Sequence, residues 1–396
     1  MKILVWTDSN ALAGTERHCL ELGAGLQDAG VSVRVGCRPK SPMTRVLEQQ
    51  GVEIVLLDAE DAPFRAFRTI RGLLRKGDLD LIHAHNGRAT MLACLAVRSA
   101  GCGCVVATQH FISPARASRR GLRRLASDLV HGWVNGQVTG WVAISRAVAD
   151  QIAARGDAPP SCVSIVPNGT GWPNAGEPGR IAARDKLGLP QSTLVLLCVA
   201  RLASEKGLEV LLNGCAMLMQ EGLSFRLVFV GDGVLQRSLQ RLAGLLGLSG
   251  CVRWVGYQPE PGEWMRAADL LILPSTEEPF GLVLIEAMSR GIPVLAAAAG
   301  GPVEIVDASC GMLFQPGDAR DLASKAWQIL RHPVLMKRLG EGGLVRWVKS
   351  YQAGIMVARM IEVYGRVLSS ASGRSAPKTE AGQGGGGLAV AAKGNE

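Results

Sequence analysis

The sequence predicts an α/β protein with two doubly wound domains, each built on a parallel sheet covered by helices. Short runs rich in Val, Leu and Ile alternate with longer helix-like segments almost throughout the chain. This alternation is typical of βαβ units, which place parallel strands in one sheet. The length of 396 residues also favours two domains, because hydrophobic cores tend to split beyond about 250 residues.

The first series of strands defines an N-terminal domain at residues 1–172. We expect strands near 2–6, 31–36, 52–57, 79–84, 103–108, 138–144 and 162–166. Helical stretches such as ERHCLELGAGLQDAG separate them. The segment PNGTGWPNAGEPG, at 167–179, is rich in Pro and Gly and favours turns. It is therefore predicted to link the two domains.

A second series defines a C-terminal domain at residues 173–345. We expect strands near 194–200, 225–230, 252–256, 270–274, 293–296 and 311–314. The piece at about 345–368 is predicted to be a last helix that returns to the N-terminal domain. The residues at 369–396 are rich in Gly, Ala and polar side chains, so we expect a disordered tail.

Composition and cysteine use favour a cytoplasmic protein. Hydrophobic residues make up 47% of the chain and charged residues 19%, which is a globular composition. The start MKILVWTDSN lacks the apolar core of a signal peptide. No uncharged apolar run reaches the roughly 18 residues of a membrane span. The ten cysteines lie mostly singly in apolar stretches, as reduced thiols do.

A basic segment in the N-terminal half predicts an anionic partner. The net charge is +9, and part of it comes from one arc of a predicted amphipathic helix: Arg116, Arg119, Arg120, Arg123 and Arg124. Apolar residues from Leu122 to Trp133 recur on the other arc. Such a helix suits an anionic membrane surface, and the alternative is a helix packed on its own sheet with solvated arginines. Aromatic residues are only 5% of the chain, so we expect no nucleic-acid partner.

Two carboxylates follow the strand ADLLILP. Glu278 lies in the loop STEEPFG and Glu286 within the next helix, LVLIEAMSRG. Ligands of parallel sheets bind beyond the carboxyl ends of strands, where helix N-termini favour phosphate. Either carboxylate alone is explained by the helix dipole or by a solvated surface. However, Glu286 lies in the apolar stretch LVLIEAM, where an ionised group needs a partner.

Basic and glycine residues follow two other strands of the second domain. Arg201 comes directly after LLCVA, and Lys206 precedes the next helix. Both side chains suit a diphosphate, although a lone Arg or Lys is more often a solvated surface charge. Gly231 and Asp232 belong to a GDG turn after LVFV, where the backbone can approach a base or a phosphate closely. An ordinary tight turn is the alternative.

The first domain offers a histidine and a glycine. His110 follows the strand VVATQ, and His83 and His85 end the strand LIHAH. A histidine in such a place is a candidate for catalysis or a structural hydrogen-bonding group. Gly14, in NALAGTERH, precedes a predicted helix and would let a substrate pass near the backbone, unless it is simply a turn. The acidic pair at Asp78 precedes its strand and so faces the wrong end of the sheet, and we expect no metal site.

The second-domain motifs occur in the order of a known family. The segments ARLASEKG, VFVGDG, VGY, ADLLILPSTEEPFGLVLIEAMSRGIPV and GGPVEIV resemble those of retaining glycosyltransferase family four, of the GT-B fold. The likeness extends to about residue 368. It is closest to members that build bacterial cell-surface polysaccharide or lipopolysaccharide.

The resemblance implies a role for each candidate. Glu278 and Glu286 match the ends of an E-x7-E motif, with Glu278 near the transferred sugar and Glu286 on the ribose, while Arg201 and Lys206 match a diphosphate-binding pair. The remaining matches are Phe280, Gly281 and Leu282 in the donor loop, His110 as the first-domain active-site histidine, and Gly14 in the loop near donor and acceptor. That loop often reads Gly-Gly in the family but reads Ala13-Gly14 here.

The resemblance also implies an activity. We expect metal-independent transfer of a hexose, mannose or glucose, from GDP-mannose or UDP-glucose, with retained anomeric configuration and no cofactor. The first domain would face a lipid-linked oligosaccharide, lipopolysaccharide or exopolysaccharide acceptor. The enzyme would act in the cytoplasm, with the basic segment on the inner membrane face. The alternatives are a sugar-nucleotide epimerase or phosphorylase, and a catalytically dead sugar-nucleotide-binding scaffold.

Overall fold

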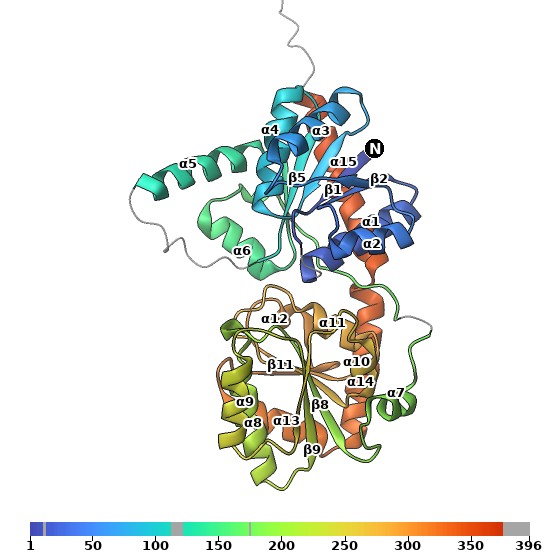
Figure 1. Cartoon of the computed structure of the whole chain (residues 1–396), viewed down its shortest axis with the longest axis vertical. Coiled ribbons are helices and arrows are strands. Elements are labelled where there is room, and N and C mark those ends of the chain that lie inside the picture. Colours follow the sequence, from blue (N-terminus) through green and yellow to red (C-terminus); the bar gives the residue numbers. More distant parts are fainter. Residues whose placement is uncertain (11–12, 112–121, 174–175, 375–396) are drawn as a thin grey trace, which may run out of the picture.

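Two parallel sheets form the framework of the protein (Figure 1). The structure is a computed structural model that describes residues 1–10, 13–111, 122–173 and 176–374. The first sheet contains β1 Lys2–Trp6, β2 Ser32–Cys37, β3 Ile54–Leu56, β4 Leu81–Ala84, β5 Cys104–Gln109, β6 Gly140–Ala143 and β7 Val163–Ile165. The second contains β8 Leu194–Val199, β9 Phe225–Val230, β10 Val252–Gly256, β11 Leu270–Leu273, β12 Val294–Ala297 and β13 Gly311–Phe314.

The strand orders are those of doubly wound sheets. The first is β3-β2-β1-β4-β5-β6-β7 and the second is β10-β9-β8-β11-β12-β13. The order reverses between β1 and β4 and again between β8 and β11, and ligands bind at such switch points. The inner strands β4 and β11 are buried along their whole length, because helices cover both faces. All thirteen predicted strands are confirmed, with bounds shifted by at most a few residues.

Helices cover both faces of the first sheet, and several begin or end at side chains suited to the place. Asn86 caps α4 by accepting a hydrogen bond from the Ala89 N–H, and Ser145 caps α6 through the Val148 N–H. Gly101 and Gly156 end these two helices in the left-handed conformation. The helices are α1 Gly14–Asp28, α2 Pro42–Gln49, α3 Pro63–Arg75, α4 Gly87–Ala100, α5 Leu122–Gln137 and α6 Arg146–Arg155, followed by the 3-10 turn η1 Pro160–Cys162.

The second sheet is covered in the same way. Asp318 caps α13 by accepting from the N–H groups of Arg320 and Asp321, and Pro333 starts α14, where its missing N–H costs nothing. The helices are α7 Arg180–Leu187, α8 Leu208–Gln220, α9 Gln236–Leu245, α10 Gly262–Ala267, α11 Leu282–Met288, α12 Pro302–Ile305, α13 Ala319–Leu330 and α14 Pro333–Ser350, with the 3-10 turn η2 Ser204–Lys206.

The chain passes between the domains twice, and the two passages are bonded to each other. After α14, the helix α15 Ala353–Arg374 packs against α1 and β5 of the first domain. The Thr170 N–H donates to the Tyr351 carbonyl at 3.0 Å, and the Ala353 N–H donates to the Thr170 carbonyl at 2.9 Å. Gly169 leaves no room for a side chain, because an added Cβ would lie 2.6 Å from the Gln352 carbonyl oxygen.

The prediction of one last helix at 345–368 is wrong. Residues 345–350 end α14, and α15 begins only at Ala353. The interruption coincides with the contact to Thr170, which uses backbone groups that a continuous helix would occupy. The predicted disordered tail is wrong for residues 369–374, which continue α15. Its remainder, 375–396, lies outside the described residues.

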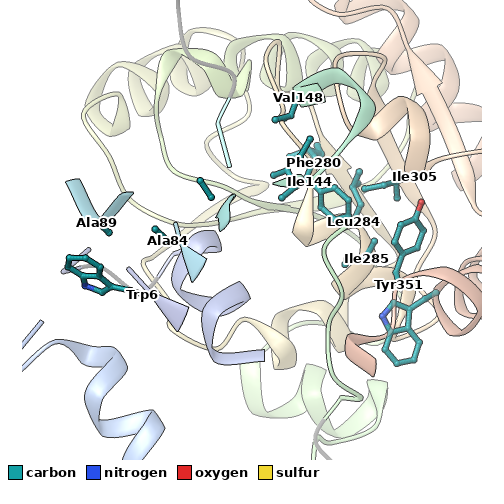
Figure 2. Packing of buried hydrophobic residues seen from close by; sticks show 14 of the residues in the cluster. Trp6, Ala84, Ala89, Ile144, Val148, Phe280, Leu284, Ile285, Ile305 and Tyr351 are labelled. Carbon is teal, nitrogen blue, oxygen red and sulfur yellow. The ribbon is translucent and has the colours of Figure 1, made fainter. Parts of the chain in front are cut away.

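Apolar packing is continuous across the domain boundary. Ile144, just before α6, and Val148, within it, belong to the same buried cluster as Phe280, Leu284 and Ile305 of the second domain. Figure 2 shows these side chains gathered between the ribbons of the two domains. The contact holds the carboxyl ends of the two sheets face to face, so the loops that follow the strands meet in one region.

Candidate active site

Glu278 and Lys206 meet at the carboxyl end of β11. The Lys206 ammonium donates to Glu278 Oε2 at 2.7 Å, and the Ser275 hydroxyl donates to the same oxygen at 3.1 Å. The Glu278 residue is only 9% exposed. A buried carboxylate is tolerated when it is paired and hydrogen-bonded, and both conditions hold here. The structure therefore joins two residues that the sequence placed in separate motifs.

Backbone contacts hold the loops around this pair together. The Thr276 N–H donates to the Glu205 carbonyl at 3.0 Å, and the Gly301 N–H donates to the Glu278 carbonyl at 2.9 Å. Gly207 has a φ of 60°, and a Cβ added there would lie 2.1 Å from the Pro274 carbonyl oxygen. Loops that follow β8, β11 and β12 are thereby locked into one unit, which fixes the position of the ion pair.

Arg201 lies in the same region but outside the ion pair. Its guanidinium contacts Glu205 Oε1 at 2.5 Å, and its side chain is 70% exposed. The neighbouring Leu202 N–H donates to the Asp232 carbonyl at 2.7 Å. Gly231 has a φ of 141° and lies so close to Ala200 that a Cβ would be 2.0 Å from its carbonyl oxygen. The GDG turn thus packs directly on the loop that carries Arg201, and glycine is required there.

The N-termini of α1 and α11 face each other across the cleft. Gly281 has a φ of 100° and precedes α11, which begins at Leu282. A Cβ on Gly14, the first residue of α1, would lie 3.2 Å from the Leu282 side chain. Phe280 is buried, with its ring 6.2 Å from that of Tyr351. The Phe280 ring therefore anchors the donor loop, and the backbone around Gly281 borders the cleft.

Glu286 has a charged partner from the opposite domain. The Arg17 guanidinium contacts Glu286 Oε1 at 2.9 Å, and it also donates to the Pro259 carbonyl. The side chains of Arg17 and Glu286 are 31% and 14% exposed. The sequence showed that Glu286 needed a partner but did not reveal Arg17. One signal was present, because Arg17 lies one helical turn after Gly14 and so on the same side of α1.

The start of α6 also contacts the second domain. The Ser145 hydroxyl donates to the Pro279 carbonyl at 2.7 Å, and the Arg146 N–H donates to Glu304 Oε1 at 2.7 Å. A carboxylate at a helix N-terminus is favoured by the helix dipole. The sequence analysis missed Ser145, and it noted Glu304 only as part of the motif GGPVEIV. The signal available for Ser145 was a capping residue at the end of a buried strand, VAIS.

Four histidines gather at the carboxyl ends of β4 and β5. His85 Nδ1 and His110 Nε2 are hydrogen-bonded at 2.9 Å, and the rings of His18 and His110 are 5.0 Å apart. His83 is held by Tyr364 and Thr108, at 2.7 and 2.6 Å. Burial lowers the pKa of His18 to about 4 and holds the pKa values of His83, His85 and His110 well below their usual range. These rings are therefore neutral at physiological pH.

A cavity of about 790 Å³ opens beside Glu286, between the two domains. Residues of both domains line it, among them Arg17, Glu21, Trp172 and Glu177. Burial raises the pKa of Glu21, and the nearby Glu286 carboxylate acts in the same direction. The cavity has room for part of a substrate of nucleotide size.

Comparison with known proteins identifies the family. The profile described as Glycosyl transferase 4-like domain matches residues 13–169, and that of Glycosyl transferases group 1 matches residues 179–345. A D-inositol 3-phosphate glycosyltransferase of Thermobispora bispora is 30% identical over 391 residues, which cover 90% of each chain. The chain belongs to glycosyltransferase family four. It is a transferase enzyme.

Other relatives agree with this family-four assignment. A D-inositol 3-phosphate glycosyltransferase of Streptomyces avermitilis is 30% identical over 363 residues, covering 83% of this chain and 77% of the relative. The crystal structure of HepE from Anabaena in complex with UDP and glucose has a TM-score of 0.79 at 22% identity, covering 92% of this chain and 99% of HepE. The likeness to HepE confirms the GT-B fold.

The structure describes only part of the predicted membrane-binding segment. Residues 112–121, which include Arg116, Arg119 and Arg120, lie outside the described residues, as do the side chains of Arg123 and Arg124. Further along α5, Leu129 and Val130 are 67% and 50% exposed. Among the helices that the structure describes, none combines the length and the apolar character needed to cross a bilayer.

Proposed function

We propose that this enzyme transfers a hexose from a nucleotide diphosphate sugar to a polysaccharide-type acceptor, with retained configuration and without a metal ion. The observation that carries the proposal is the buried Lys206–Glu278 pair at the end of β11, with Glu286 further along the chain in α11. The arrangement offers positive charge for a diphosphate, a carboxylate near the sugar and another near the ribose.

The proposed donor geometry assigns one task to each group. Lys206, Arg201 and the amides around Gly281 face the diphosphate, which gains negative charge as the bond to the sugar breaks. Fixed positive groups stabilise such charge strongly because they need no reorganisation during the reaction. The acceptor oxygen attacks C1 from the face of the leaving group, and its proton passes to the leaving diphosphate. Lys206 thus supplies the positive charge near the diphosphate that a metal ion supplies in other transferases.

Donor and product analysis test this function. Glucose from UDP-glucose is the first candidate, because HepE binds UDP and glucose, and mannose from GDP-mannose is the second. We expect one of them to raise the melting temperature of the chain by mass action. NMR of the product should show the anomeric configuration of the donor, and EDTA should not lower the rate. Release of an epimer or a sugar phosphate from donor alone would instead support an epimerase or a phosphorylase.

The proposed acceptor is a lipid-linked oligosaccharide or a lipopolysaccharide or exopolysaccharide chain. The exposed apolar residues Leu129 and Val130 lie next to the predicted basic segment, and both suit the cytoplasmic face of a membrane. The relatives named D-inositol 3-phosphate glycosyltransferases favour a second candidate, a small phosphorylated polyol. Assays with membrane extracts and with inositol phosphate in parallel distinguish the two. Flotation with anionic liposomes tests the membrane contact, and binding should fall with salt.

Removal of Arg17 should tighten nucleotide binding. In the structure Arg17 holds Glu286, the carboxylate that the proposal assigns to the ribose, so the nucleotide competes with the guanidinium. We expect Arg17→Met to lower the Kd of the nucleoside diphosphate about two- to fivefold, the range of a partly exposed ion pair. Isothermal titration measures it. Arg34→Met, which removes the ion pair to Glu53 at 2.6 Å, is the control and should change nothing. Weaker binding by Arg17→Met would show that Arg17 helps to hold the nucleotide.

A further inference from the structure

Two of the gathered histidines, His18 and His85, lack hydrogen bonds that buried polar atoms require. Both ring nitrogens of His18 and the Nε2 atom of His85 are buried without a partner at hydrogen-bond geometry, and so is the Oδ1 atom of Asn168. The Asn168 side chain still lies near enough to His18 to oppose the lowering of its pKa. Buried polar groups are nearly always paired. His83 obeys this rule through Tyr364 and Thr108, so its role is structural. The unpaired atoms of His18 and His85 call for a ligand.

The free nitrogens converge with His110. One nitrogen from each of His18, His85 and His110 can be chosen so that all three lie within 4.8 Å of one another. The nearest pair, His85 Nδ1 and His110 Nε2, is 2.9 Å apart. Tetrahedral zinc holds imidazole nitrogens at about 2.0–2.1 Å, which separates two such nitrogens by about 3.3 Å. The three rings are therefore close enough to share one ion, and a metal bound through His85 Nδ1 and His110 Nε2 displaces the proton of their present hydrogen bond.

We propose that His18, His85 and His110 bind one transition-metal dication, zinc or an ion of similar preference, at the inner edge of the cleft. Imidazole ligands suit zinc, copper and nickel, whereas magnesium and calcium prefer oxygen. Three protein ligands leave a fourth position for water or another ligand. Asn168 Oδ1 adds an acceptor near His18, and the ring N–H groups of metal-bound histidines are generally hydrogen-bonded in this way.

The metal is not a participant in the proposed sugar transfer. His110 is the first-domain histidine that the family resemblance assigns to the active site, and a metal-bound ring is no longer free to contact a substrate. Occupancy and transfer therefore exclude each other at this residue. The site stands apart from the proposed function, because its test measures metal binding in the absence of any sugar nucleotide.

Cobalt and zinc titrations of the chelator-treated full chain test the site. We expect one equivalent of Co²⁺ to give the visible absorption of a tetrahedral nitrogen site, and zinc to displace it. His18→Gln and His85→Gln should each weaken cobalt binding at least tenfold. His332→Ala removes an exposed histidine far along the chain, and this control should bind as the wild type does. Absence of the band in the wild type, or an unchanged affinity in both Gln variants, overturns the proposal.

X-ray absorption of the zinc-loaded wild type covers the case in which a variant fails to fold. We expect imidazole scatterers at about 2.0 Å and no sulfur. A zinc–sulfur distance of about 2.3 Å would place the ion on cysteine instead. Ten free cysteines are present, among them the exposed Cys102, so this outcome is a real alternative and would refute the histidine site.

Discussion

Lys206→Met should lower the kcat of sugar transfer on the order of 100-fold, with a much smaller change in the KM of the donor. A loss of this size corresponds to about 3 kcal/mol of transition-state stabilisation, as for a lost oxyanion-hole donor. The physical reason is that the diphosphate gains charge only as the sugar leaves. Lys206 is 19% exposed at its side chain, so water screens its charge poorly. Steady-state release of nucleoside diphosphate measures both constants.

Loss of Lys206 also leaves Glu278 without its counter-charge, so the catalytic and structural effects must be separated. Among the residues that the structure describes, the Glu278 carboxylate would keep only the Ser275 hydroxyl as a hydrogen-bond donor. In the double variant Lys206→Met/Glu278→Gln the unpaired charge is gone. If Lys206 acts on the diphosphate, the double variant stays at least as slow as the single one. A recovery of kcat would show that the orphaned carboxylate caused the loss.

The matched control for Lys206 is Lys337→Met. Lys337 forms an i,i+4 contact with Glu341 at 3.8 Å, with both side chains largely exposed, and exposed pairs of this kind contribute little. We expect its kcat to stay within a factor of two of the wild type. A similar kcat in Lys206→Met would remove the charge argument from the proposed mechanism.

The sequence predicted those parts of the fold that depend on local pattern. Most strands are short apolar runs, and the inner ones such as β4 and β11 are fully buried, whereas the edge strands β3, β7 and β10 are partly exposed. Short apolar runs can be recognised in a sequence without knowledge of their partners. The sequence did not predict the interruption between α14 and α15, because the segment KSYQAGIM contains no proline and is typical of a continuous helix. The interruption lies where Tyr351 and Ala353 bond with Thr170, which is distant in sequence. Tertiary contacts of this kind override helix propensity.

In the candidate site, too, the sequence predicted residues that belong to local motifs and missed contacts between the two domains. The order of motifs brought Glu278 and Lys206 into one prediction, and the structure places them 2.7 Å apart. Arg17 and Ser145 were missed because their partners lie in the other domain, and the relative placement of two domains leaves no periodic signal in a sequence. Arg201 was predicted to bind a diphosphate together with Lys206, and in the structure its guanidinium contacts Glu205. The partner of a flexible, exposed side chain depends on whether a ligand is bound, and a sequence does not specify this.

Glu286→Gln should weaken the binding of nucleoside diphosphate about tenfold to a hundredfold while lowering kcat far less. The reason is that a hydrogen bond to an ionised group contributes about 1.5–3 kcal/mol, and a neutral amide keeps only part of it. Glu286 would contact the ribose both before and during the reaction. Loss of this contact therefore weakens the ground state and the transition state alike. Isothermal titration gives the Kd, and Glu341→Gln on the exposed face of α14 is the control.

A change in the ligand identifies the group that Glu286 contacts. The 2′,3′-dideoxy form of the nucleoside diphosphate lacks the ribose hydroxyls, so it should bind the wild type as weakly as the complete nucleotide binds Glu286→Gln. Against the Glu286→Gln variant, the two nucleotides should then bind with nearly equal affinity, because the interaction can be lost only once. Additive losses would mean that Glu286 and the hydroxyls act independently, and the carboxylate would then serve mainly to hold Arg17 across the cleft.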